Sequence, residues 1–237
     1  MKRFMIVSKE RSGTNHFVSL LRSHPQIACY GEVFRDGYRV TQMIGEELAH
    51  YMPIETRTSN PDRFLDDLEA FVTPQAKVLG FKIFPMQFLP VMQIARRPEM
   101  HVIRLVRPNL LATYSSSRIA AITGQGAVRV GEEVRRVKLK FDARDFEAYV
   151  NAQGEKDDEV NRALEVIPED RIFRMVYSEL AQEPVLEKLL KFLDVEPMPM
   201  TSKAKKRNPP IILDRFNNPR KALAYLKRNG LEHWAEE

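Results

Sequence analysis

The residues with the clearest chemical potential lie near the start of the chain, at 11–15, where the sequence reads RSGTN. A short apolar run at 4–7 precedes them, and a segment with apolar residues on one helical face follows. This order predicts a strand, a tight turn and a helix that begins at Thr14 or Asn15. Such a helix attracts anions, because its first N–H groups are unpaired and its dipole is positive at that end.

The side chains of the turn strengthen this expectation. Arg11 supplies a fixed positive charge with several donors, and Ser12 and Thr14 supply hydroxyls. Gly13 lets the backbone come close to a ligand. The turn differs from the nucleoside triphosphate loop G-x-x-x-x-G-K-[ST], because it has one glycine and no lysine after it. An ordinary strand–turn–helix without a ligand is the alternative.

A second candidate anion site follows the apolar run at 101–107, which ends in Arg107. The helix predicted at about 109–122 carries Ser115 and Ser116. An arginine and a hydroxyl together recognise a phosphate monoester dianion. The two serines lie about 100° apart around a helix, so only one of them can face the phosphate well. The alternative is a strand-end arginine that pairs with a carboxylate, beside serines on a solvated helix face.

Strands and helices alternate along the chain. Further strand-like runs and helical patterns lie at 77–84, 86–95, 171–177 and 184–195. This alternation predicts an α/β fold, with a parallel sheet flanked by helices in three layers. Arg11 and Arg107 then fall at the carboxyl ends of strands, where open parallel sheets bind ligands. The stretch 128–141 alternates apolar and charged residues, which is compatible with an edge strand or a helix.

Length and composition predict one globular domain over 1–237, with 43% hydrophobic and 29% charged residues. The net charge of +5 favours anionic ligands without choosing among them. A single cysteine, Cys29, excludes an internal disulfide framework and suits a reducing, cytoplasmic location. The sequence shows neither a signal peptide nor an apolar run of about 18 residues, as a membrane span needs. It also shows no metal-ligand spacing, so we expect no metal.

The turn at 11–15 resembles the 5′-phosphosulfate loop of sulfotransferases that use 3′-phosphoadenosine-5′-phosphosulfate (PAPS), which reads K-S-G-T-T-W or R-S-G-T/S-T/N. The continuation SLLRSHPQIACYGEVF is similar to bacterial carbohydrate sulfotransferases related to the nodulation-factor group. The resemblance implies a P-loop-NTPase-like sulfotransferase fold. It also implies that the residues of the turn, with Asn15, hold the phosphosulfate. His16 stands where many relatives have a tryptophan beside the base; a surface histidine is equally compatible with the sequence.

The second motif resembles the nodulation-type pattern R-x-N-L-L-x-x-Y-x-S, which overlays Arg107 to Ser116. We therefore favour Ser116 as the ligand of the PAPS 3′-phosphate, whereas the commoner eukaryotic spacing selects Ser115. The segment VYSEL at 176–180 is similar to the family's V-x-Y-E-D-L, in which the tyrosine lies by the adenine. This implies the same place for Tyr177, although Ser178 replaces the usual acidic residue.

A basic segment, KAKKRNPP at 203–210, resembles a late K-x-N-P segment of bacterial carbohydrate sulfotransferases. The resemblance makes Lys206, Arg207 and Asn208 candidates for closing over the 3′-phosphate. A solvated basic loop is the alternative, because charge runs are usually that.

The implied reaction moves a sulfuryl group from PAPS to an acceptor hydroxyl and releases adenosine 3′,5′-bisphosphate (PAP). It needs positioning, charge stabilisation and a base. Lys82 matches the family's lysine near the transferring group, and Phe84 stands where many eukaryotic relatives have a histidine base. Glu32 is our candidate base, although it can instead pair with Arg35. His24 is the other candidate, but a cation there also suits the end of the first helix.

The resemblance implies a small-molecule or glycan acceptor, on a carbohydrate or glycolipid, and leaves its identity and the oligomeric state open. The alternative function is a nucleoside triphosphate kinase on a related fold, which the missing G-K-[ST] disfavours. Nucleic-acid binding by the basic segment is a third possibility. We expect no nucleic-acid partner, because no recognition element accompanies that segment and acidic stretches at 155–159 and 232–237 dilute its field.

Overall fold

The computed structural model describes residues 1–37, 46–126, 133–204 and 208–237. In this part of the chain, one five-stranded sheet is formed by β1 (Lys2–Val7), β2 (Ile27–Cys29), β3 (Val78–Ile83), β4 (Met100–Val106) and β5 (Ile172–Val176). The strand order is β2-β3-β1-β4-β5, and every neighbouring pair is parallel. The predicted α/β fold is confirmed. The first strand, β1, lies at the centre of the sheet between β3 and β4, so the ends of these two strands flank the turn that follows β1.

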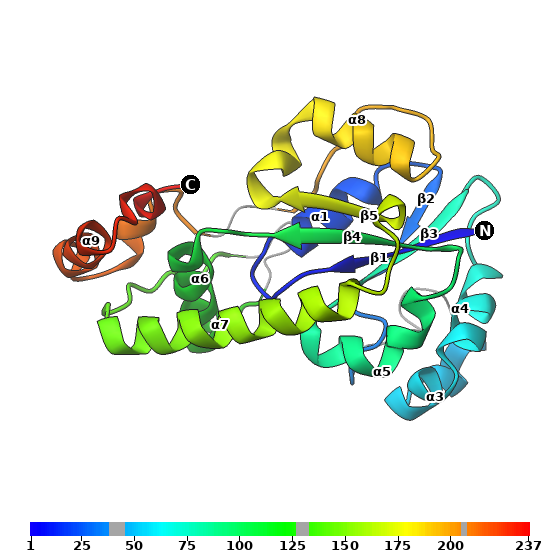
Figure 1. The fold of residues 1–237 in the computed structure, drawn as a ribbon, viewed down its shortest axis with the longest axis horizontal. Helices are drawn as coiled ribbons and strands as arrows, with labels where there is room; N and C mark the ends of the chain where they lie inside the picture. The colour runs from blue at the N-terminus through cyan, green and yellow to red at the C-terminus, as the bar shows by residue number, and fades with distance from the viewer. Residues whose placement is uncertain (38–45, 127–132, 205–207) are drawn as a thin grey trace.

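Helices cover both faces of the sheet (Figure 1). One face carries α1 (Thr14–Leu21) and α8 (Glu183–Phe192), and the other carries α4 (Pro61–Glu69), α5 (Pro85–Ala95) and α7 (Ala143–Leu164). Successive side chains of a strand point to opposite faces. Accordingly, Phe4 and Ile6 pack with the first group of helices, whereas Met5 and Val7 pack with the second. Burial on both faces explains why the strands read as continuous apolar runs.

A third hydrophobic cluster lies beyond the arrowheads of the strands (Figure 1). It joins the start of α7 to α6 (Leu110–Thr123), the 3-10 helices η4 (Ile212–Arg215) and η5 (Glu232–Ala235), and α9 (Pro219–Arg228). The Tyr114 ring packs at its centre, with centroids 5.2 Å from Phe146 and 6.5 Å from Phe216. This packing brings the segment 208–237 next to Arg107. The other short helices among the described residues are η1 (Glu46–Tyr51), α3 (Ile54–Ser59), η2 (Glu169–Arg171) and η3 (Tyr177–Ala181).

The stretch 128–141 is neither a strand nor a helix where the structure describes it, at 133–141. Both alternatives from the sequence are therefore wrong for this part, and 127–132 lie outside the described residues. Leu139 instead forms an isolated parallel bridge with Phe216. Its side chain is buried in the third cluster together with Phe141. The apolar residues of this stretch thus pack against the later helices instead of extending the sheet.

Candidate active site

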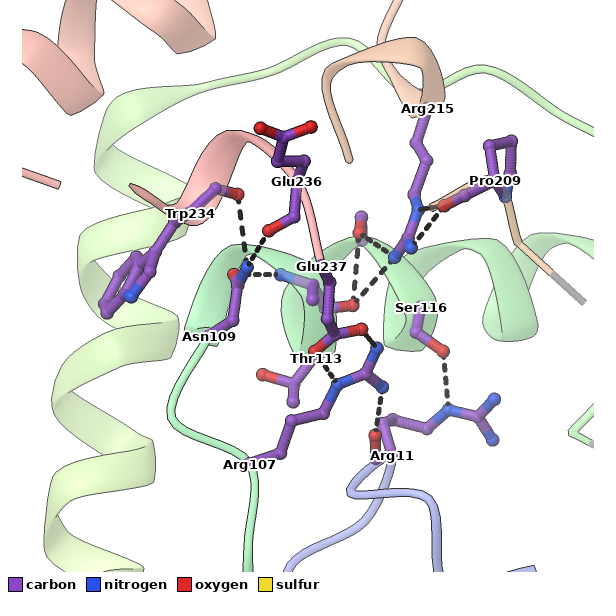
Figure 2. A network of polar contacts seen from close by, with 12 residues as sticks. Arg11, Arg107, Asn109, Thr113, Ser116, Pro209, Arg215, Trp234, Glu236 and Glu237 are labelled. Carbon is purple, nitrogen blue, oxygen red and sulfur yellow. Dashed lines mark hydrogen bonds and ion pairs between the residues drawn. The ribbon is translucent and has the colours of Figure 1, made fainter. Parts of the chain in front are cut away.

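The turns after β1 and β4 meet at one edge of the sheet. Because these strands are neighbours, Arg11 and Arg107 lie side by side although they are far apart in the sequence. Arg107 Nη1 donates a hydrogen bond to the carbonyl oxygen of Arg11 at 2.7 Å (Figure 2). Arg11 Nε in turn donates to Ser116 Oγ at 3.0 Å. The structure therefore joins the two predicted anion sites by direct contacts.

The turn before α1 contains two residues in the left-handed region, Arg11 with φ 67° and Gly13 with φ 85°. A non-glycine residue in this region is uncommon, and such residues cluster at functional sites. A Cβ at Gly13 would lie 2.4 Å from a ring carbon of Tyr177, so only glycine fits. The Arg107 guanidinium lies over the Tyr177 ring, 4.2 Å from its centroid. Glycine, tyrosine and arginine thus pack as one unit across the two strand ends.

The first turn of α1 opens into a cavity of about 710 Å³. Gly13 is the N-cap residue, and within the described chain no side chain caps this end. The first N–H groups of a helix have no acceptor inside the helix, which makes a helix start a common site for anions. The cavity volume is in the range of small-molecule and cofactor sites. The predicted residues that line it are Arg11, Gly13, Thr14, Asn15, His16, Glu32, Lys82, Arg107, Ser116, Tyr177 and Asn208.

Two of the predicted residues that the structure describes, Ser12 and Ser115, lie outside the cavity lining. Ser12 is buried, at 1% exposure. Lys206 and Arg207 lie outside the described residues. Ser115 is also buried: its Oγ donates to the Ala112 carbonyl at 3.2 Å and accepts from Arg215 Nη1 at 3.1 Å. Ser116, by contrast, lines the cavity. This geometry favours Ser116 over Ser115 as the ligand of an anion, and that role stays a prediction.

A buried lysine links the candidate base to the start of α1. Lys82 Nζ lies 3.1 Å from Glu32 Oε1 and donates to Asn15 Oδ1 at 2.6 Å. Burial lowers the pKa of Lys82, and the charge of Glu32 counteracts part of that effect. The second Glu32 oxygen lies 3.4 Å from Arg35 Nη1, so the predicted pair with Arg35 is also present. Phe84 packs near the lysine, 5.2 Å from Nζ to the ring centroid.

His24 is buried away from the cavity. Its Nε2 lies 2.8 Å from the Glu196 carbonyl oxygen, and its Nδ1 accepts from the Gln26 N–H at 3.1 Å. These partners hold the His24 ring outside the cavity lining, which disfavours the base role. His24 does lie at the end of α1, where its backbone N–H donates to the Leu21 carbonyl oxygen at 3.1 Å, but its ring contacts other segments. Cys29 is buried, and burial raises the pKa of its thiol to about 12. A thiol with that pKa is a poor nucleophile at neutral pH.

Two residues at the site were not anticipated from the sequence. Arg215, 4% exposed, donates to the Pro209 carbonyl oxygen through Nε at 3.1 Å and Nη2 at 2.6 Å. Its place in a short segment with three apolar residues, ILDRF, could have indicated a buried arginine. Glu237 accepts from Arg107 Nε at 2.7 Å through Oε1, and its Oε2 contacts Arg107 Nη2 (Figure 2). No sequence pattern indicated this contact, because it depends on the packing of 208–237.

Known protein families were compared with the sequence, and one of them matches most of the chain. Residues 3–199 match the sequence profile described as "Sulfotransferase family". The chain belongs to the sulfotransferase family. As an enzyme of that family, it shares its fold with the sulfotransferase domain from the curacin biosynthetic pathway, with a TM-score of 0.54 and 16% identity over 83% of this chain and 75% of that chain. The match to the sulfotransferase from Alicyclobacillus acidocaldarius has a TM-score of 0.53 and 16% identity, over 97% and 95% of the two chains.

No curated protein matches this sulfotransferase significantly in sequence. Two further findings concern the described residues as a whole. None of their groups of His, Cys, Asp and Glu side chains is arranged to hold a metal ion. None of their helices combines the length and the apolar character that a membrane crossing requires.

The two serines give a test of which side chain meets the donor. Ser116→Ala should weaken PAP binding about tenfold with little change in melting temperature, because one hydroxyl donor to a charged phosphate is lost. Ser115→Ala should instead lower the melting temperature, because the buried Arg215 loses a partner. Titration calorimetry and thermal melts measure both effects. The opposite ranking in PAP affinity would show that the phosphate meets Ser115.

Proposed function

We propose that this sulfotransferase moves a sulfuryl group from PAPS to an acceptor hydroxyl. The observation that carries the proposal is the pair of anion sites at neighbouring strand ends, joined by the Arg107–Arg11 hydrogen bond. A nucleotide with charged groups at both its 5′ and 3′ positions requires two such sites. The cavity reaches from the start of α1 to Arg107, so one ligand can contact both.

The parts of the donor map onto different walls of the cavity. The N–H groups at the start of α1 and the Arg11 side chain suit the phosphosulfate, since they offer donors and positive charge. Arg107 and Ser116 suit the 3′-phosphate. Tyr177 and His16 line the same cavity and offer aromatic faces to the adenine. Asn208, after the basic segment, also lines it and suits a polar contact with the donor.

Glu32 and Lys82 lie where transfer would take place. In the proposed step, the acceptor oxygen attacks sulfur in line, and the bond from sulfur to the bridging phosphate oxygen breaks. The acceptor proton passes to a Glu32 carboxylate oxygen, and PAP leaves with the negative charge on its 5′-phosphate. The Lys82 ammonium and the N–H groups of α1 stabilise the charge that develops on the leaving oxygen. The bond between Lys82 and Asn15 holds the lysine against the helix start.

The proposed acceptor is a carbohydrate or the sugar part of a glycolipid. A second cavity of about 670 Å³ shares Asn15, Glu32, Arg35 and Lys82 with the first. Glu32 and Lys82 therefore form a wall common to both cavities. The other residues that line the second cavity belong to α1, to the segment just after it and to later parts of the chain, and they include Ser and Thr hydroxyls and basic side chains: Val18, Ser19, Arg22, Ser23, Gly31, Thr201 and Lys203. Hydroxyl and charged side chains of this kind can bind the hydroxyl groups of a sugar, which is the acceptor that the resemblance to the nodulation-type enzymes implies.

The donor assignment separates the sulfotransferase from a kinase. PAP at about 100 times its dissociation constant should raise the melting temperature by about 5–10 °C, because only the folded state binds it. ATP with Mg²⁺ should give a smaller shift, since it lacks the 3′-phosphate that Arg107 and Ser116 would bind. A thermal melt with each nucleotide measures the difference. Equal shifts for both nucleotides would favour the kinase.

The role of Glu32 is tested by Glu32→Gln, which keeps the size of the side chain and removes the base. Turnover should fall about 100-fold or more, while PAP binding is unchanged. Arg35→Gln is the matched control, because it removes the other partner of Glu32 without removing the carboxylate. Steady-state kinetics with labelled PAPS over a panel of sugars, glycolipids and phenols gives the comparison. Turnover that survives in Glu32→Gln would leave Glu32 with a structural role.

A further inference from the structure

A carboxylate already occupies Arg107 in the unliganded protein. Glu237 meets the Nε–Nη2 edge of the guanidinium with both its oxygens (Figure 2). The third nitrogen, Nη1, donates to the Arg11 carbonyl oxygen. The contact is largely removed from solvent, because the Arg107 side chain is 9% exposed and the Glu237 side chain 18%. A carboxylate thus pairs with two of the three guanidinium nitrogens of Arg107, and both residues line the cavity.

The backbone around Glu237 is fixed independently of this ion pair. Asn109 Nδ2 donates to the carbonyl oxygens of Trp234 at 3.2 Å and Glu236 at 3.3 Å. The Glu237 N–H donates to the Pro210 carbonyl oxygen at 3.2 Å. Trp234 also packs against the third hydrophobic cluster. Several hydrogen bonds to the main chain at 234–237 therefore hold the Glu237 backbone in a position from which its carboxylate reaches the cavity.

A phosphate monoester would bind Arg107 through the same edge. A guanidinium recognises carboxylates and phosphates alike, by two parallel N–H···O bonds. One edge cannot serve both groups at once, and two anions in a site sheltered from water repel each other strongly. Binding of a 3′-phosphate at Arg107 therefore requires Glu237 to leave.

Local charge explains why a carboxylate is held there without a ligand. Arg11, Arg107 and Arg215 all line the cavity, so several positive charges lie in its wall. Buried or half-buried cations are costly without a counter-charge. In the free protein Glu237 supplies this negative counter-charge at Arg107, and in the complex the 3′-phosphate would supply it.

We propose that Glu237 is an internal competitor of the donor's 3′-phosphate. It occupies Arg107 in the unliganded enzyme, leaves when PAPS binds and returns as PAP departs. The inference rests on the proposed function, because it takes Arg107 as the 3′-phosphate ligand. As a consequence, PAPS and PAP bind more weakly than they would to a site without Glu237. Their apparent dissociation constants equal the intrinsic constants divided by the fraction of molecules in which Glu237 has left Arg107. Glu237 therefore sets the affinity for 3′-phosphorylated nucleotides and favours release of the product.

The test compares two nucleotides that differ in the 3′-phosphate, PAP and adenosine 5′-monophosphate. Glu237→Gln keeps the shape of the side chain and removes its charge. It should tighten PAP binding about tenfold. A tenfold change corresponds to a wild type in which Glu237 occupies Arg107 in about nine molecules of ten. Binding of adenosine 5′-monophosphate should not change, since it has no group for Arg107. Glu236→Gln is the matched control, because Glu236 contributes its backbone oxygen to Asn109, and it should change neither affinity.

Calorimetric dissociation constants and thermal melts give the result, with Glu237→Ala as a second variant. The melting temperature without ligand should fall in both Glu237 variants, while the shift caused by PAP should grow. A residue with a purely structural role would lower the melting temperature and leave the affinity for PAP unchanged or weaker. That outcome, or an equal gain for adenosine 5′-monophosphate, would overturn the inference while PAP still binds the wild type. If no variant bound PAP, the donor assignment itself would fall, and this inference with it.

Discussion

The hydrogen bond from Arg107 Nη1 to the Arg11 carbonyl oxygen is the contact on which the site depends. It is possible because β1 and β4 are neighbours in the parallel sheet, so the turns that follow them emerge side by side. It also helps to hold Arg11 in its left-handed conformation, while Tyr177 fills the space that only a glycine at position 13 leaves open. The two anion sites are thus held at a fixed separation before any ligand arrives, which lowers the entropic cost of binding a donor that spans both.

Two of the cations that line the cavity are each paired with a carboxylate that also lines it. Glu32 lies against Lys82, and Glu237 lies against Arg107. In the proposed mechanism these carboxylates behave differently. Glu32 stays in place, because it borders both cavities and accepts the acceptor proton. Glu237 gives way, because the donor brings its own negative charge to Arg107. The positive charge of Arg107, which binds the donor in the complex, is thus paired with Glu237 in the free enzyme.

Local parts of this architecture could be predicted from the sequence, whereas long-range packing could not. The turn at 11–15 and the strands that end near Arg11 and Arg107 are set by apolar runs and by glycine, which act over a few residues. Family motifs added Lys82 and Ser116, which the structure places at the same cavity. The positions of Arg215 and Glu237 depend on how α9 and η5 pack on α6, far along the chain. The alternation at 128–141 gave a wrong prediction for the same reason. Its apolar residues Leu139 and Phe141 pack in the third hydrophobic cluster, and the described part of the stretch forms neither a strand nor a helix.

A crystal structure of the enzyme with PAP tests the central claim most directly. The account predicts the 3′-phosphate on Arg107 and Ser116, and the 5′-phosphate on the N–H groups at the start of α1. It also predicts that the Glu237 carboxylate has left the guanidinium. PAP bound elsewhere, or a cavity that stays empty at saturating PAP with Glu237 still on Arg107, would contradict it.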